Sequence, residues 1–419
     1  MVLENFKKKL GNLDKLYSMF DAAMLSVSRL LVGVVIARTS GVDDFSQYIL
    51  FTAISVIFTN LVSSRFITPL SNLAAGRSRD ERRKVYHWAR IRIRRTHLVA
   101  LCLVLVAGIF VAEGAIAWLV LLGFGLASVL ELERYRLRTQ LQIGFEMKRG
   151  ALADAAGIAI MGIIFAGGIV LFELPVLFFW WGSVVGSLVS IILMNPNSEK
   201  GSPNDSDELG EADSRSLESI GSTMLIGSVA NSACSRVQPF ALKTLGGSIA
   251  VASFGAAWTF VGPIRMLTAA LGGMLRPRLA LYHNRGDKKS FQSLARRVNA
   301  LLGACGGAGV LFSAFFGTEA MIFVFGDSLK SAGILLPFAL AYGTIDAMTS
   351  MQMIGLQVLG KKGAQAATRL RITTAVASVI LLIPSCYYWG ALGAYGSLLV
   401  AEAIYGVGAF VYLRLQSDK

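Results

Sequence analysis

Residues 20–41 read FDAAMLSVSRLLVGVVIARTSG and form a hydrophobic stretch with Arg29 near its middle and Arg38 at its end. The stretch is long enough to cross about 30 Å of hydrocarbon. A lone cation there costs about 2.5–3.5 kcal/mol on insertion scales, so we expect Arg29 to face protein or water. The pattern returns at residues 232–247, SACSRVQPFALKTLGG, where Arg236 takes the place of Arg29.

The composition is that of a helical membrane protein. Hydrophobic residues make up 54% of the 419 residues, charged residues make up 16%, and the mean hydropathy is +0.59. Soluble domains do not reach this balance. The net charge of +14 is explained by Lys and Arg in cytoplasmic loops, so it does not indicate nucleic-acid binding. The four cysteines stand singly and without a CxxC motif, so we predict neither a metal site nor a cofactor.

Hydropathy predicts an all-α polytopic membrane protein with about twelve transmembrane helices. With both termini in the cytoplasm, 33 of the 40 Lys and Arg lie in inside segments and three in outside loops, which strongly supports this topology. We expect tight turns at 113–114, 173–174 and 389–390. The predicted spans are 20–37, 46–64, 98–112, 115–132, 151–172, 174–194, 219–241, 249–275, 298–317, 331–359, 368–388 and 391–413.

The chain divides into two similar halves. Residues 195–218, NPNSEKGSPNDSDELGEADSRSLE, are polar and acidic and predict a flexible cytoplasmic linker between an N-terminal lobe (1–194) and a C-terminal lobe (219–419). Pro69 and Pro277 begin similar basic segments after the second and eighth spans. Since six spans separate the copies, we expect parallel repeats related by an axis along the membrane normal. In the first copy, Ser78 and Glu81 predict a capping box at a helix start.

Four arginines within or beside spans are candidate substrate-binding residues. Guanidinium groups stay charged and bind phosphate or carboxylate through two hydrogen bonds, so a cationic cavity is one interpretation. The other is that each arginine pairs with a buried acid or reaches an interface. Pro239, one turn after Arg236, predicts a kink in the seventh span. The four candidates are Arg29, Arg65, Arg236 and Arg265.

Acids within spans are candidates for coupling transport to an ion, or for neutralising an arginine. Asp21 lies eight residues before Arg29, roughly 12 Å along a helix, and is not its direct partner. Asp346 and Glu402 fall in mid-span and are the stronger candidates. A protonated carboxyl bonded to a neighbouring helix is the alternative for each. Asp154 is the fourth candidate, and Glu131 is a further acid within or near a span.

The sequence does not favour an enzyme. The histidines His87, His97 and His283 belong to basic cytoplasmic segments, and no Walker-type glycine loop, GxSxG motif or cluster of metal ligands occurs. The predicted outside loops are all short, which argues against a polymerase or ligase built on a large outer loop.

The first span with its continuation IARTSGVDDFSQYILFTAIS, the segment ELERYRLRTQLQIG after the fourth span, and the six-plus-six repeat resemble the Wzx-type polysaccharide flippases. These belong to the multidrug/oligosaccharidyl-lipid/polysaccharide (MOP) exporter superfamily. Ser46 departs from a glycine that is frequent in the family. The resemblance implies two six-helix lobes around a central cavity in the bacterial inner membrane. It also implies an undecaprenyl-pyrophosphate-linked oligosaccharide as substrate, moved from the cytoplasmic to the periplasmic leaflet.

On this resemblance, Arg29 and Arg236 would hold the pyrophosphate, while Arg265 and Arg65 would escort it. The expected partners are the lipid-linked substrate, membrane lipids and polysaccharide polymerase or export machinery, with the protein itself a monomer. A MATE-type drug or cation antiporter and a lipid II flippase of the same superfamily are the alternatives. The antiporter would need acids as the dominant cavity charges, and lipid II flippases typically have fourteen spans.

Overall fold

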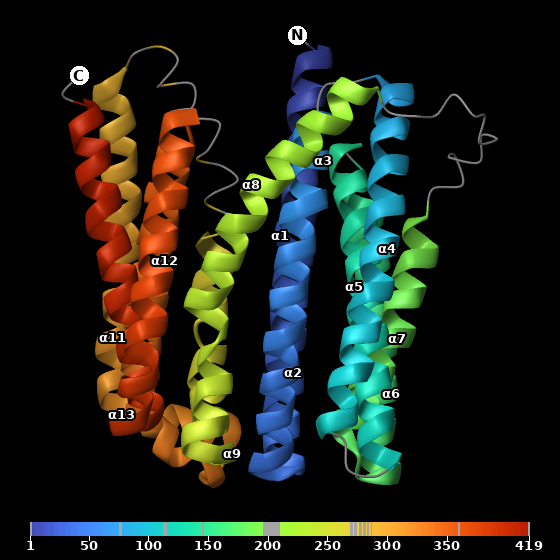
Figure 1. Ribbon diagram of the computed structural model, residues 1–419, viewed down its shortest axis with the longest axis vertical. Coiled ribbons are helices and arrows are strands. Elements are labelled where there is room, and N and C mark those ends of the chain that lie inside the picture. The colour runs from blue at the N-terminus through green and yellow to red at the C-terminus, as the bar shows by residue number, and fades with distance from the viewer. Residues whose placement is uncertain are drawn as a thin grey trace. The chain divides into compact units, whose positions relative to one another are not determined.

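Every regular element in the described part of the computed structural model is a helix (Figure 1). The structure describes residues 2–74, 78–111, 115–144, 146–195, 210–268, 287–358 and 361–417, with single residues between 271 and 285. The elements are α1 (Val2–Thr39), α2 (Gly41–Val62), the π-helix η1 (Ser63–Ile67), α3 (Thr68–Ala74), α4 (Arg79–Val111), α5 (Ala115–Ile143), α6 (Met147–Phe172), α7 (Pro175–Met194), α8 (Glu211–Arg236), α9 (Gln238–Thr259), α11 (Lys288–Phe325), the 3₁₀-helix η3 (Asp327–Leu335), α12 (Leu336–Val358) and α13 (Lys361–Ser417).

Eight helical segments among the described residues have the length and hydropathy needed to cross a membrane. Two of them run for 47 and 49 residues, which is long enough for two crossings each at 1.5 Å per residue. The predicted class, an all-helical polytopic membrane protein, is confirmed. The count of twelve spans stays a prediction.

The chain forms two compact units. Unit 1 contains residues 1–32 and 54–228, and unit 2 contains residues 33–53 and 229–419. The chain therefore passes from one unit to the other within α1, α2 and α8. The six-plus-six division into lobes at 1–194 and 219–419 follows the repeat instead and stays a prediction. Most of the predicted linker, residues 196–209, lies outside the described residues.

In unit 1, α6 and α7 form a hairpin (Figure 1). The turn is at Glu173, which has a positive φ of 56°, and the tight turn predicted at 173–174 is confirmed. Gly157 and Gly186 allow the two backbones to approach closely, because a Cβ at Gly157 would lie 2.5 Å from the Gly186 carbonyl oxygen. Ser190 of α7 donates to the carbonyl of Ala153 at 3.0 Å. Small residues are what closely packed membrane helices require at their contact.

Two further helix starts follow from local hydrogen bonds. The Ser78 backbone N–H donates to the Glu81 carboxylate at 3.0 Å and the Glu81 N–H donates to the Ser78 hydroxyl at 3.4 Å, so the predicted capping box at the start of α4 is confirmed. Asp287 caps α11 and accepts from the N–H of Ser290 at 3.0 Å. The hydrogen bonds from Ser290 lower the pKa of the Asp287 carboxyl.

In unit 2, α13 changes direction at Gly390, where φ is 54°. A Cβ at Gly393 would overlap the Ser385 carbonyl, so the two parts of α13 lie directly against each other there. The predicted turn at 389–390 therefore coincides with this break, while the one at 113–114 lies outside the described residues. Arg38 donates to the Val324 carbonyl at 2.9 Å, which ties the end of α1 to the end of α11.

The kink expected near Pro239 is an interruption between α8 and α9. α8 ends at Arg236 and α9 begins at Gln238, with Pro239 in its first turn. A proline is tolerated at that position because its missing N–H would have no partner in the helix. A second interruption lies within α9 at Gly247, which has a φ of 71°.

Candidate functional site

Arg29 of α1 forms an ion pair with Glu131 of α5, within unit 1. The guanidinium of Arg134, one helical turn after Glu131, is 3.9 Å from the same carboxylate. The Arg29 side chain is 52% exposed, whereas that of Glu131 is 25% exposed. Arg29 therefore has an acid partner and is also accessible from outside the unit.

Two more acids in unit 1 are held by the same face of α5. Arg134 and Arg138 are one turn apart, so their side chains project together. Arg134 Nε lies 3.5 Å from the fully buried carboxylate of Asp154, and Arg138 Nε lies 4.0 Å from it. Arg138 also pairs with Asp21 of α1 at 2.5 Å. Asp21 thus has a partner on another helix, as its distance from Arg29 along α1 requires.

Arg65 is engaged by α8. It lies in η1 and donates to the carbonyl of Glu218 at 3.3 Å and to the hydroxyl of Ser222. Gly221 stands between these two residues, and a Cβ there would overlap the Arg65 carbonyl. Arg65 is therefore part of a close contact between η1 and α8 in unit 1.

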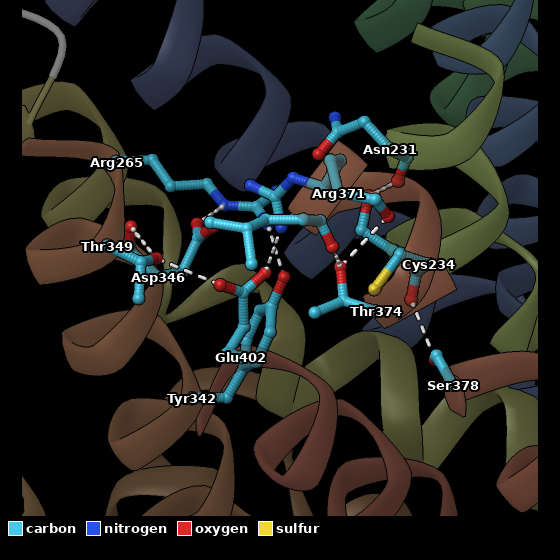
Figure 2. Close-up of polar contacts among 12 residues, drawn as sticks. Asn231, Cys234, Arg265, Tyr342, Asp346, Thr349, Arg371, Thr374, Ser378 and Glu402 are labelled. Carbon is cyan, nitrogen blue, oxygen red and sulfur yellow. Dashed lines mark hydrogen bonds and ion pairs between the residues drawn. The ribbon is translucent and has the colours of Figure 1, made fainter. Parts of the chain in front are cut away.

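Unit 2 contains a buried ion pair between Arg371 and Glu402 (Figure 2). The two groups are 2.6 Å apart, and the Thr349 hydroxyl donates to the other Glu402 oxygen at 2.8 Å. Glu402 is 1% exposed. The Arg371 guanidinium also lies 4.4 Å from the ring centre of Tyr405. Both carboxylate oxygens of Glu402 thus accept a hydrogen bond from a protein side chain.

A second charge pair in unit 2 joins Arg265 and Asp346 (Figure 2). Arg265 Nε is 3.4 Å from the carboxylate, and the same guanidinium donates to the Tyr342 hydroxyl at 3.3 Å. The pair is partly accessible, with side-chain exposures of 28% and 19%. The structure places both Asp346 and Glu402 beside arginines. Their role in ion coupling stays a prediction.

Arg236 and Arg265 both lie over the indole ring of Trp258, in unit 2. Their guanidinium carbons are 5.4 Å and 4.5 Å from the ring centre. Trp258 is itself stacked against Phe254 and Tyr342. The sequence pattern had matched Arg236 with Arg29, but these two residues belong to different units. Their joint action on one substrate stays a prediction.

Sequence reasoning missed four residues of these clusters: Arg134, Arg138, Arg371 and Trp258. The spacing of Glu131, Arg134 and Arg138 on one helical face was a usable signal. The charge count places Arg371 in the basic cytoplasmic segment 361–371. Its partner Glu402 is 31 residues away and approaches only through the break in α13, so the sequence does not reveal the pair. No sequence signal marks Trp258 as a contact of two arginines.

The described residues contain no group of three or more His, Cys, Asp and Glu side chains placed to hold a metal ion. Their arginine–carboxylate clusters can instead exchange partners with an anion, because guanidinium groups bind phosphate and carboxylate with the same geometry.

Solved transporters share this fold. An inward-facing multidrug resistance MATE family transporter of the MOP superfamily superposes with a TM-score of 0.74, at 13% identity over 97% of this chain and 94% of its own. The lipid II flippase MurJ, in an inward closed conformation, gives 0.69 at 16% identity over 95% and 87%. A Pyrococcus furiosus MOP superfamily transporter, described as having a binding pocket of reverse polarity, gives 0.64 at 14% identity over 96% and 94%.

No protein-family model and no curated protein sequence matches the chain. At these identities the structural likeness shows the fold alone. The chain therefore has the fold of the MOP superfamily transporters, as its resemblance to that superfamily implied.

Proposed function

We propose that this protein is a Wzx-type flippase of the bacterial inner membrane. It moves an undecaprenyl-pyrophosphate-linked oligosaccharide from the cytoplasmic to the periplasmic leaflet by alternating access, with twelve spans and both termini in the cytoplasm. The shared fold supports transport, and the hydropathy supports a membrane location. The choice of substrate depends on the charges of the clusters described above.

One observation carries the choice of an anionic substrate: each of the five acids in these clusters has an arginine within 4.0 Å. A drug or cation antiporter needs carboxylates with surplus negative charge. Here the clusters hold more arginines than acids. The arginines are Arg29, Arg65, Arg134, Arg138, Arg236, Arg265 and Arg371, and the acids are Asp21, Glu131, Asp154, Asp346 and Glu402.

The pyrophosphate is the part of the substrate that these arginines recognise. Arg29 and Arg236 are its proposed main contacts, and Arg265 and Arg65 assist. A guanidinium offers paired donors that match two phosphate oxygens. The acids Asp21, Asp154, Asp346 and Glu402 take part in ion coupling by releasing their arginines, since each of them lies within 4.0 Å of an arginine.

A lipid II flippase is the second candidate, because its substrate carries the same pyrophosphate and the fold match to MurJ supports it. The two candidates differ in the sugar part of the substrate. The glycan profile of a strain that lacks the gene separates them: loss of a surface polysaccharide supports the first, and arrest of cell-wall synthesis supports the second.

Complementation of that strain tests the proposed role of the arginines. Arg236→Ala is expected to abolish surface polysaccharide and to cause lipid-linked repeat units to accumulate in the cytoplasmic leaflet. Lys330→Ala, a change of an exposed cation in unit 2, is the matched control and is expected to export normally. The amount of each variant in the membrane is measured by immunoblot. Normal surface polysaccharide in both Arg236→Ala and Arg29→Ala would refute the proposal.

Arg29 needs its own control because its removal leaves Glu131 with only the more distant Arg134, at 3.9 Å, to balance its charge. The double variant Arg29→Ala/Glu131→Gln removes both charges. If Arg29 binds substrate, the double variant stays inactive. If Arg29 serves only to neutralise Glu131, the double variant recovers export.

A further inference from the structure

Two arginines from separate segments share one indole ring in unit 2. Arg236 is the last residue of α8, Arg265 lies in helical residues 262–268, and Trp258 lies near the end of α9. The guanidinium carbons are 5.4 Å and 4.5 Å from the ring centre. The separation of the two cations therefore cannot exceed the sum of these two distances. The face of an indole is the best aromatic partner for a cation, so it offsets part of the repulsion between them.

The ring of Trp258 is held in place by other aromatic side chains. Its centre is 5.5 Å from that of Phe254 and 5.3 Å from that of Tyr342, and both pairs are stacked. Tyr395 stacks on Phe254 at 4.6 Å and donates its hydroxyl to the Phe254 carbonyl at 2.9 Å. Phe254, Tyr342 and Tyr395 are buried, while Trp258 is partly exposed. A buried stack of this kind fixes the ring against which the cations rest.

Asp346 is already paired with one of the two cations, Arg265. Its carboxylate is 3.4 Å from Arg265 Nε. It occupies the position that an oxygen of an incoming phosphate group would take. A phosphate that binds Arg265 through Nε must displace this carboxylate, so Asp346 competes with the substrate at that nitrogen.

We propose that Trp258 is a positioning residue that fixes the spacing of Arg236 and Arg265, so that together they select a diphosphate over a monophosphate. A diphosphate carries charge on two adjacent phosphate groups and uses both cations at once, whereas a monophosphate uses one. This inference rests on the proposed function and gives Arg265 an equal part with Arg236 in distinguishing a diphosphate from a monophosphate.

The test compares binding of inorganic pyrophosphate and inorganic phosphate to the full-length protein in lipid nanodiscs, measured by calorimetry. Wild-type protein is expected to prefer pyrophosphate. Trp258→Leu is expected to lose about tenfold of that preference, because the shared cation–π contact is removed. Trp258→Phe keeps a ring and is expected to stay within about threefold of wild type. Trp389→Leu, a change of an exposed tryptophan in the same unit, is the control and is expected to behave as wild type.

A preference unchanged in Trp258→Leu overturns the inference, and so does an equal loss in Trp258→Phe and Trp258→Leu, which indicates a packing role only. If Trp258→Leu does not fold, as judged by size-exclusion chromatography, Asp346→Asn decides. Removal of the competing charge frees both cations, so the preference for pyrophosphate over phosphate is expected to rise severalfold, and an unchanged preference overturns the inference.

The outcome for the proposed function is separate. A strain lacking the gene that exports polysaccharide normally refutes the function, whatever binds in vitro. Export that depends on the gene, by a wild-type protein without preference for pyrophosphate, refutes only the role of Trp258.

Discussion

Each of the five acids in the clusters described above lies beside an arginine. Arg371 and Glu402 are 2.6 Å apart, and Thr349 completes the bonds of the carboxylate. A buried pair of this kind contributes little net stability, because both charges have lost their water. The loss of one partner is strongly destabilising, since the remaining charge stays buried without an opposite charge beside it.

Arg371→Met is therefore expected to lower the free energy of unfolding by about 3–5 kcal/mol. The double variant Arg371→Met/Glu402→Leu is expected to recover most of this loss, since neither charge remains. Thermal unfolding in detergent, followed by fluorescence-detected size-exclusion chromatography, measures both. A double variant as unstable as the single one would show that the pair does more than neutralise charge.

Sequence alone reached these residues only in part. The sequence identifies Asp346 and Glu402 as mid-span acids, and neutralising an arginine is one of the roles that it predicts for them. The partners were not assignable, because Arg265 and Asp346 come from segments 81 residues apart in the chain. The same holds for Arg134 and Asp154, which meet only through the packing of α5 on α6.

At the scale of elements, the two helices of the α6–α7 hairpin approach closely in unit 1. The turn was predictable, since a single charged residue, Glu173, interrupts a long apolar run. The register was not, because many small residues are available along both helices. The structure selects Gly157 and Gly186, whose backbones touch.

Gly157→Ala is expected to destabilise the protein by about 1–3 kcal/mol, because the added methyl group would strike the carbonyl of Gly186. Gly162→Ala is the matched control on the same helix. A Cβ at that position meets nothing within 4 Å, so the change is expected to be neutral or slightly stabilising. Equal melting temperatures for the two variants in detergent would contradict the packing described.

At the scale of the molecule, composition and hydropathy are enough to predict an all-helical membrane protein. The resemblance of its motifs is enough to predict the fold of the MOP superfamily transporters. The two compact units were not predictable from the repeat. Residues 33–53 are part of unit 2 together with residues 229–419, because Arg38 and Phe45 contact the end of α11. No local sequence pattern predicts that contact.

The twelve-span topology makes a separate prediction. In a cysteine-free background, Lys330→Cys is expected to react with a membrane-impermeant thiol reagent added to spheroplasts, because it lies in an outside loop of the predicted topology. Arg215→Cys is expected to react only after permeabilisation. Both side chains are exposed, so access is not limited by burial. The reverse pattern would require an inverted topology, and equal labelling would require a different number of spans.

The central claim is that the protein moves a pyrophosphate-linked oligosaccharide lipid across a bilayer. The most direct measurement uses liposomes that contain the purified protein and a polyprenyl-pyrophosphate-linked oligosaccharide, with a membrane-impermeant glycosidase outside. Wild-type protein is predicted to make nearly all of the sugar cleavable, while Arg236→Ala leaves the inner-leaflet half protected. Protection of that half in wild-type liposomes, equal to that in protein-free liposomes, would contradict the account.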